Sequence, residues 1–222
     1  MCGRFGLHFD WQKTSRLVWD HFHVEMDEAS YPLPQFNIAP TQQVMVLIHD
    51  GEKYRIGLAR WGLPLGNGTS QVVSNARSES IFEKPMFRSL IKQRRCLVIA
   101  SGFYEWQRDV KPSRVYWFHP QQQPFLIFAG LYQVVQDQEV KKVFATLITT
   151  QANELMAPIH DRLPVMLNPD QWRHWVHPKT PIDEFSFLFK STNFNDLIYY
   201  EVSNRVNKVI HNDVGCLEPI KK

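Results

Sequence analysis

The sequence predicts an α+β fold: a single domain over residues 1–222, built on a curved, largely antiparallel, barrel-like sheet with flanking short helices. Strand-like segments outnumber helix-like ones. The helices interrupt the strands irregularly, which is not the pattern of a βαβ winding. Of the 222 residues, 44% are hydrophobic, which is enough for a well-packed core. No internal repeat, low-complexity tract or long linker divides the chain.

The first predicted element is a helix in the segment KTSRLVWDHFHVEM. Leu17, Val18 and Phe22 fall near one face of such a helix, as helical periodicity requires. Thr14 or Ser15 is placed to cap it. The segment therefore predicts a helix that packs one apolar face on the sheet.

Strands are predicted through the middle of the chain. VMVLI and YRIGLARW flank HDGE, whose Asp-Gly pair is typical of a hairpin turn. FRSLIK predicts a short helix. After it, aromatic and β-branched runs predict strands at CLVIA (96–100), FYEW (103–106), VYWF (115–118), PFLIFAGLY (124–132) and KVFATLITT (142–150), the last as a central strand.

Two further helices are predicted toward the C-terminus. In NPDQWRHWV, Asn168 is placed as an N-cap, and Pro169 is at the first helical position, which proline favours. TPIDEFSFLFK shows the same pattern, with Thr180 placed as an N-cap and Pro181 at the first helical position.

Cysteine usage and apolar patterning limit the class of protein. The cysteines Cys2, Cys96 and Cys216 are odd in number and far apart, which favours a reducing compartment over a disulfide framework. No Cys-x-x-Cys pair is present, so the sequence predicts no metal site, and we expect no cofactor. No apolar run approaches the length of a membrane span, and no secretory signal is evident. We therefore expect a cytoplasmic monomer with no membrane partner.

The charge is mildly basic, at +3 from 25 Lys and Arg against 22 Asp and Glu. This balance does not by itself indicate a nucleic-acid partner. Arg88, Lys92, Arg94 and Arg95 stand close together in FRSLIKQRR. A solvated face and a phosphate-binding patch explain that cluster equally well.

Four short stretches combine polar residues with special backbone residues: CGRF at 2–5, FNIAPT at 36–41, SNARSE at 74–79 and PIHDRLPV at 158–165. Each also has an ordinary structural explanation. Asn37 can cap a turn. Arg77 and Glu79 can form a surface pair on a strand, and His160 with Asp161 can belong to a solvated loop.

Two residues carry distinctive chemistry. If Met1 is removed, Cys2 becomes the terminus and presents an amine and a thiol on adjacent carbons, although a second-position cysteine can also be an accident of a frayed end. Glu105 in SGFYEW is a carboxylate among aromatic residues, where desolvation disfavours the charged form. An arginine partner would give Glu105 a purely structural role.

Taken together, these motifs resemble a known family. MCGRF, NIAP, WG, NARSE, GFYEW and IHDRLPV stand in the order and approximate spacing of the SRAP family, the SOS-response-associated peptidase domain. The similarity runs from residue 2 to about 167 and continues through VSNRVNKV at 202–209. It covers motifs rather than every residue.

The resemblance implies capture of an abasic site in single-stranded or junction DNA. Met1 would be removed, and the Cys2 amine would form a Schiff base with the ring-opened sugar aldehyde. The thiol would then close on the same carbon to give a thiazolidine, a step that effective molarity favours. Such a crosslink would shield the lesion in the DNA damage response, and the protein would associate with the nucleoid when it acts on DNA.

The resemblance also implies roles for individual residues. Asn75 would hydrogen-bond the captured sugar, Glu105 would move protons, and His160 would act as general acid and base. Guanidinium groups suit phosphate binding. The implied DNA-binding residues are Arg4, Asn37, Pro40, Arg77 and Arg162, of which Asn37 and Pro40 would line the pocket wall.

One segment departs from the family pattern. After RWG, many members carry an aromatic pair, whereas this chain reads LPLGNGTS, with Asn67 and Gly68 at that place. Base stacking contributes roughly 1–3 kcal/mol per base, so weaker DNA binding is expected unless Phe87, or Leu63 and Leu65, substitute. Trp61 and Trp106 are expected in the core.

Two other functions stay open at the level of sequence. The family's name implies a cysteine peptidase, which would use Cys2 with His160 and Glu105 and whose target could be the chain's own Met1–Cys2 bond. A passive reader of modified DNA bases would instead bind reversibly and without Cys2.

Overall fold

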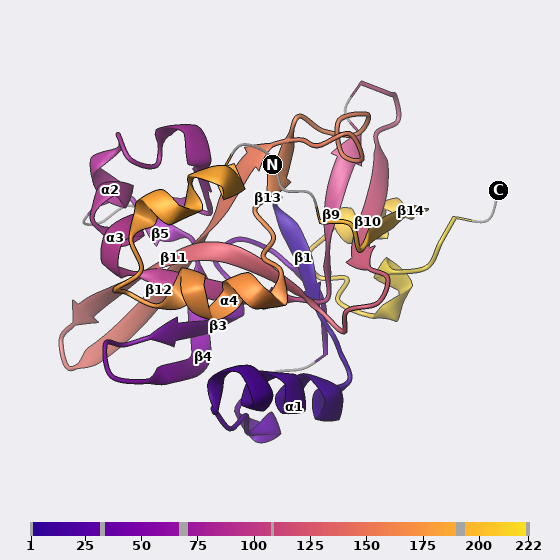
Figure 1. Cartoon of the computed structure of the whole chain (residues 1–222). Helices are drawn as coiled ribbons and strands as arrows, with labels where there is room; N and C mark the ends of the chain where they lie inside the picture. The colour runs from indigo at the N-terminus through magenta and orange to yellow at the C-terminus, as the bar shows by residue number, and fades with distance from the viewer. Residues whose placement is uncertain (1, 32–33, 67–70, 108, 190–193, 221–222) are drawn as a thin grey trace.

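The computed structural model describes residues 2–31, 34–66, 71–107, 109–189 and 194–220. Its larger sheet closes into a ring, because β11, β8, β3, β4 and β12 pair in succession and β11 also pairs with β12 (Figure 1). The ring strands are β3 (Gln43–His49), β4 (Tyr54–Trp61), β8 (Arg95–Ala100), β11 (Leu126–Asp137) and β12 (Val140–Gln151).

A second sheet of five antiparallel strands packs against this ring. Its order is β14 (Leu197–Val202), β10 (Arg114–Pro120), β9 (Gly102–Gln107), β1 (Arg4–Leu7) and β2 (Gln35–Ile38). The ring of Phe5 lies 4.9 Å from that of Trp61 and 6.1 Å from that of Phe128, between ring centroids. These contacts join the two sheets into one buried core. The prediction of an α+β fold on a curved, barrel-like sheet is confirmed.

Strand β12 gathers the short strands. It pairs in parallel with β4 and with β7 (Asn75–Arg77), and antiparallel with β11 and with β13 (Arg162–Pro164). The small hairpin of β5 (Leu63–Pro64) and β6 (Val72–Val73) lies between β4 and β7 in the chain. The SNARSE and HDRLPV segments, far apart in sequence, therefore meet on β12.

Short helices flank the sheets. The α-helices are α1 (Trp11–Phe22), α2 (Pro85–Arg88), α3 (Leu90–Gln93) and α4 (Pro169–Val176). The 3-10 helices are η1 (Glu28–Ser30), η2 (Ser78–Ser80), η3 (Ile182–Phe189), η4 (Asn204–Asn207) and η5 (Val214–Cys216). Within the described ranges, no helix has both the length and the apolar character that crossing a bilayer requires.

The predicted elements are confirmed with three corrections. Helix α1 begins at Trp11 and not near Thr14, because the Asp10 side chain accepts from the Lys13 N–H and caps the helix. It ends at Phe22 and does not reach Met26, because His23 adopts a left-handed backbone conformation. FRSLIK is not one helix, because its first two residues end α2 and its last three begin α3, with Ser89 between these two four-residue helices. The segment after Pro181 forms the 3-10 helix η3. The N-cap position of Asn168, with Pro169 at the start of α4, and the β3–β4 hairpin are as predicted.

The pairing of β1 with β9 depends on two glycines. Gly6 lies opposite Gly102 across these strands, and the indole of Trp117 on β10 lies close to both. A Cβ on Gly102 would meet the Phe118 carbonyl oxygen at 2.4 Å and Trp117 Cζ2 at 2.5 Å. Only a residue without a side chain fits there, and β9 is the strand that carries Glu105.

We predict that Gly102→Ala lowers the free energy of unfolding by about 3 kcal/mol, because the new methyl group overlaps a backbone carbonyl that cannot move away. Gly57→Ala on β4 is the matched control, since nothing lies within 4 Å of its Cβ position. Its stability should stay within about 0.5 kcal/mol of the wild type. Urea unfolding midpoints measure both, and equal stability of the two variants would contradict the packing argument.

Candidate active site

Cys2 lies directly before β1 and its side chain is fully buried. Its thiol points toward the Arg4 carbonyl oxygen, at 4.0 Å. Burial raises the pKa of the Cys2 thiol, and the negative charge of Glu105 raises it further. The sulfur is therefore held as a neutral thiol, close to an acidic side chain.

Asn75 begins β7 and contacts Cys2 directly. Its Nδ2 donates to the Cys2 carbonyl oxygen at 2.9 Å and to Ser74 Oγ at 3.3 Å. Its Oδ1 is buried and accepts no hydrogen bond within the described part of the chain. Because a buried amide oxygen is costly to leave without a donor, Asn75 presents an acceptor beside Cys2 for an incoming donor group.

Glu105 and His160 face each other. Side chains alternate along β9, so Phe103 and Glu105 share the inner face while Tyr104 belongs to the cluster on the outer face. Glu105 is buried, and its Oε1 lies 3.7 Å from His160 Nε2. The site therefore holds an imidazole beside a carboxylate in surroundings that largely exclude water.

The loop between β12 and β13 carries His160 to this position. The backbone N–H of His160 donates to the Met156 carbonyl oxygen at 2.9 Å, which closes a turn. Gln107 Nε2 at the end of β9 donates to the Pro158 carbonyl oxygen at 3.1 Å. The loop is thus tied to the strand that holds Glu105. The structure brings Cys2, Asn75, Glu105 and His160 together from four separate segments.

Arg162 is held by protein groups. Its two terminal nitrogens form a bidentate pair with the Glu79 carboxylate, and Nη2 also donates to the Thr149 carbonyl oxygen at 2.7 Å. Glu79 lies in η2 and not on the strand, because β7 ends at Arg77. Arg77 and Glu79 are therefore not a pair on one strand face, as the spacing of SNARSE suggested. The partner of Glu79 is Arg162, 83 residues away, which the sequence did not predict.

Arg4 and Asn37 hold the C-terminal segment. Arg4 Nη1 donates to Asn37 Oδ1 at 2.7 Å and to the Val206 carbonyl oxygen at 2.5 Å. Asn37 is fully buried, and its Nδ2 lies within 3.1 Å of three carbonyl oxygens, those of Val206, Lys208 and His211. These contacts give both residues a positioning role, while their contact with DNA stays a prediction.

Other predicted residues differ in exposure. Arg77 is exposed on β7, two residues after Asn75, and Pro40 is half-buried in the turn after β2. Trp61 is buried as expected, whereas Trp106 is half-buried and donates from Nε1 to Asn207 Oδ1 at 2.7 Å. Arg77 is thus the predicted phosphate-binding residue whose guanidinium lies most open to solvent.

The candidates for base stacking also differ. Phe87 and Leu63 are buried and lie in the core, whereas Leu65 is exposed. Of the three, only Leu65 lies open to an incoming base. Asn67 and Gly68, where the sequence departs from the family pattern, lie outside the described residues.

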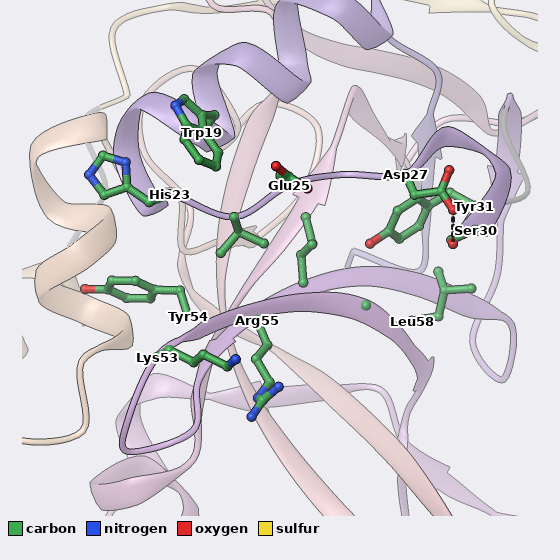
Figure 2. A pocket seen from close by; sticks show the side chains of 13 residues that line it. Trp19, His23, Glu25, Asp27, Ser30, Tyr31, Lys53, Tyr54, Arg55 and Leu58 are labelled. Atoms are coloured by element: carbon green, nitrogen blue, oxygen red, sulfur yellow. Dashed lines mark hydrogen bonds between the residues drawn. The ribbon is translucent and has the colours of Figure 1, made fainter.

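A cavity beside α1 and β4 lies away from this site. It measures about 800 Å³ and opens between the C-terminal end of α1, the segment after it and the outer side of β4 (Figure 2). Trp19, Tyr31, Tyr54 and Arg55 are among its lining residues, and none of the four clustered residues lines it. A cavity of about 620 Å³ instead borders the His160 loop, with Gln107, Pro158 and Tyr199 in its wall. Neither cavity has Cys2, Asn75, Glu105 or His160 in its wall.

Comparison with known proteins identifies the family. The family model described as SOS response associated peptidase (SRAP) matches residues 1–209. The chain belongs to the SRAP family. A relative from Bacillus subtilis (strain 168), abasic site processing protein YoqW, is 34% identical, with 98% of this chain and 99% of the relative covered. Abasic site processing protein HMCES of Xenopus tropicalis is 27% identical, over 84% of this chain and 66% of that protein.

A solved structure supports the SRAP fold. An X-ray structure of a protein from Bacteroides thetaiotaomicron matches 99% of this chain and all of that chain, with a TM-score of 0.83 and 21% identity. At that identity the match concerns the fold alone. The ring of strands and its packed sheet thus agree with an experimentally observed architecture.

We predict that the Arg162–Glu79 pair makes the stability of this SRAP chain depend on acid pH. The hydrogen bond from Arg162 lowers the folded-state pKa of Glu79, so the ionised carboxylate stabilises the fold above its unfolded pKa of about 4.5. That stabilisation is lost as the pH falls through the lower folded-state pKa. Because the Glu79 side chain is 43% exposed, solvent screening limits the effect to roughly 0.5–1 kcal/mol.

Urea unfolding of the wild type and Glu79→Gln between pH 7 and pH 3 measures this contribution. The two should differ at pH 7 and converge at pH 3. Glu83→Gln, which removes an exposed carboxylate nearby, should follow the wild type throughout. A difference between the wild type and Glu79→Gln that persists at pH 3 would show that the ion pair is not its source.

Proposed function

We propose that this SRAP chain captures ring-opened abasic sites in single-stranded DNA through a thiazolidine formed at Cys2 after removal of Met1. The observation that carries the proposal is the convergence of a thiol, an amide, an imidazole and a carboxylate at the start of β1. The relatives named abasic site processing proteins support the same substrate. No cofactor takes part in the proposed chemistry.

The first step joins the protein to the sugar. An α-amine has a pKa of about 7.7–8.0, so a useful fraction is neutral near pH 7. The Cys2 nitrogen attacks the aldehyde carbon and passes one of its protons to the aldehyde oxygen, which becomes a hydroxyl group. His160 Nε2 then gives a proton to that hydroxyl, which leaves as water while the C=N bond forms as an iminium that keeps one proton on nitrogen. Asn75 Oδ1 is placed to accept a hydrogen bond from the captured group.

The second step closes the ring. The Cys2 sulfur bonds to the iminium carbon as its proton passes to Glu105, and the electron pair of the C=N bond returns to nitrogen. Glu105 then gives this proton to His160, which replaces the one that left with water, so neither an oxidant nor a reductant is consumed. Ring closure is intramolecular, which favours the cyclic product strongly. The raised pKa of the thiol fits this order, because the amine attacks first and the sulfur needs to lose its proton only at closure.

Phosphate binding orients the DNA strand. Arg77 is exposed two residues after Asn75, so its guanidinium can reach a phosphate beside the lesion. Arg4 and Arg162 would add positive potential near the strand while they hold the C-terminal segment and Glu79. We propose that the protein acts as a monomer on single-stranded or junction DNA, in the cytoplasm or at the nucleoid.

The peptidase alternative requires a different state of the sulfur. A cysteine peptidase attacks with a thiolate, which a nearby cationic histidine stabilises. In this structure burial and Glu105 raise the pKa of the Cys2 thiol. The aminothiol mechanism therefore suits the site better than peptide hydrolysis does.

Crosslinking to an abasic oligonucleotide tests the proposal. Wild-type protein whose intact mass shows the loss of Met1 should give a heat-stable, slow-migrating band on a denaturing gel. Cys2→Ser should give no stable band, because an oxygen in place of sulfur closes a ring that hydrolyses readily. Cys96→Ala, which removes a buried thiol on β8, is the matched control and should crosslink like the wild type.

A stable adduct formed by Cys2→Ser would contradict the thiazolidine. Hydrolysis of a peptide substrate by the wild type and not by Cys2→Ala would instead establish the peptidase. Reversible, salt-sensitive DNA binding that is unaffected by Cys2→Ala would indicate the passive reader.

We further predict that Glu105→Gln slows crosslinking about 100-fold, since general acid–base groups contribute on that order. Binding of undamaged single-stranded DNA should change little, because Glu105 is buried and faces the reactive groups. Glu139→Gln, at the exposed turn between β11 and β12, is the control. Single-turnover rates and fluorescence anisotropy separate the two effects, and an unchanged rate would remove Glu105 from the mechanism.

A further inference from the structure

The two ring nitrogens of His160 face different groups. Nε2 faces Glu105, and Nδ1 faces Asp161 and the backbone N–H of Arg162. Asp161 Oδ1 lies 2.9 Å from Nδ1, and the backbone N–H of Arg162 donates to the same nitrogen at 3.0 Å. One neighbour is an acceptor and the other is a donor, so they suit different protonation states of the ring.

The two states follow from the chemistry of imidazole. When Nδ1 carries no proton, it accepts from the Arg162 N–H, and the single ring proton is on Nε2, toward Glu105. When the ring takes a second proton, Nδ1 becomes a donor and its acceptor is Asp161. In both states Nε2 carries a proton that is directed at Glu105.

We propose that Asp161 is a positioning residue of this site, whose carboxylate binds Nδ1 of His160 in its protonated form and keeps Nε2–H directed at the reactive groups. The proposal rests on the function proposed above in one respect: the protonated imidazole is the acid that releases water from the sugar adduct. Asp161 itself does not touch the DNA sugar in this arrangement.

The charged groups around His160 support this assignment. Glu105 faces the ring from β9, and Asp161 faces it from the loop. The guanidinium of Arg162 is turned away, toward Glu79 and the Thr149 carbonyl oxygen. Glu105 and Asp161 are both acidic, and a carboxylate beside an imidazole favours the cationic form of the ring.

The exposure of the His160 and Asp161 side chains decides how strongly Asp161 favours proton binding by His160 and how that contribution depends on salt. The side chain of His160 is 8% exposed, whereas that of Asp161 is 84% exposed. A pair with one partner in solvent is screened, so Asp161 should strengthen proton binding by His160 only about threefold. High salt should weaken that contribution, because screening acts within a few ångströms at 1 M ionic strength.

Nitrogen-15 NMR of the histidine rings tests the proposal without any DNA. In Asp161→Asn the pH midpoint of the His160 ring should fall by about half a unit, equal to threefold weaker proton binding. Glu154→Gln removes an exposed carboxylate from the same loop and should leave the midpoint unchanged. Unchanged amide spectra outside the loop would show that both variants fold normally.

Crosslinking rates give the second readout. The ratio of the wild-type rate to the Asp161→Asn rate should be close to 1 well below the two His160 midpoints that the NMR titration gives, where both rings are protonated. Well above both midpoints the ratio should rise to about 3, and it should fall back in 1 M salt. Protonation of the Cys2 amine affects both proteins equally, so the ratio isolates the imidazole.

The outcomes separate the two proposals. A His160 midpoint that does not move in Asp161→Asn, or a rate ratio that is the same at every pH, would overturn the role of Asp161. Failure of the wild type to crosslink would overturn the proposed function, and the NMR titration would still decide whether Asp161 holds the protonated ring.

Discussion

The pairing of β1 with β9 is the constraint on which the rest of the site depends. It requires two backbones to pass beneath the Trp117 indole, and Gly6 opposite Gly102 makes that approach possible. Once this register is set, alternation along β9 turns Glu105 to the inner face, next to the segment that begins with Cys2. A slip of one residue would turn Glu105 to the outer face and separate it from the thiol.

Arginine side chains hold the loops that complete the site. Arg162 is bound by Glu79 and the Thr149 carbonyl oxygen, which joins η2, β12 and β13. Arg4 and Asn37 bind the carbonyl oxygens of the C-terminal segment. These networks satisfy buried polar groups whose exposure to an apolar interior would otherwise be costly. The fold itself therefore holds the four clustered side chains in place, which would reduce the reorganisation that the proposed reaction requires.

The electrostatics of the site favour proton transfer over a permanently charged nucleophile. Burial and the nearby Glu105 carboxylate raise the pKa of the Cys2 thiol, and the His160 imidazole lies between two carboxylates. Such a site suits a reaction in which a neutral amine attacks first and protons then move between neighbouring groups. It differs from a cysteine–histidine pair that is poised as thiolate and imidazolium.

The sequence alone determined the elements and the family. The Asp-Gly pair predicted the β3–β4 hairpin, Asn168 with Pro169 predicted the start of α4, and six ordered motifs indicated SRAP membership. These are local signals, set by backbone conformation and by short spacings. Only the tertiary structure decided that Arg162 binds Glu79 across 83 residues and that Asp161 and Glu105 lie on opposite sides of His160. Contacts of this kind depend on strand register and loop closure, and no periodicity or motif in a single chain encodes those distances.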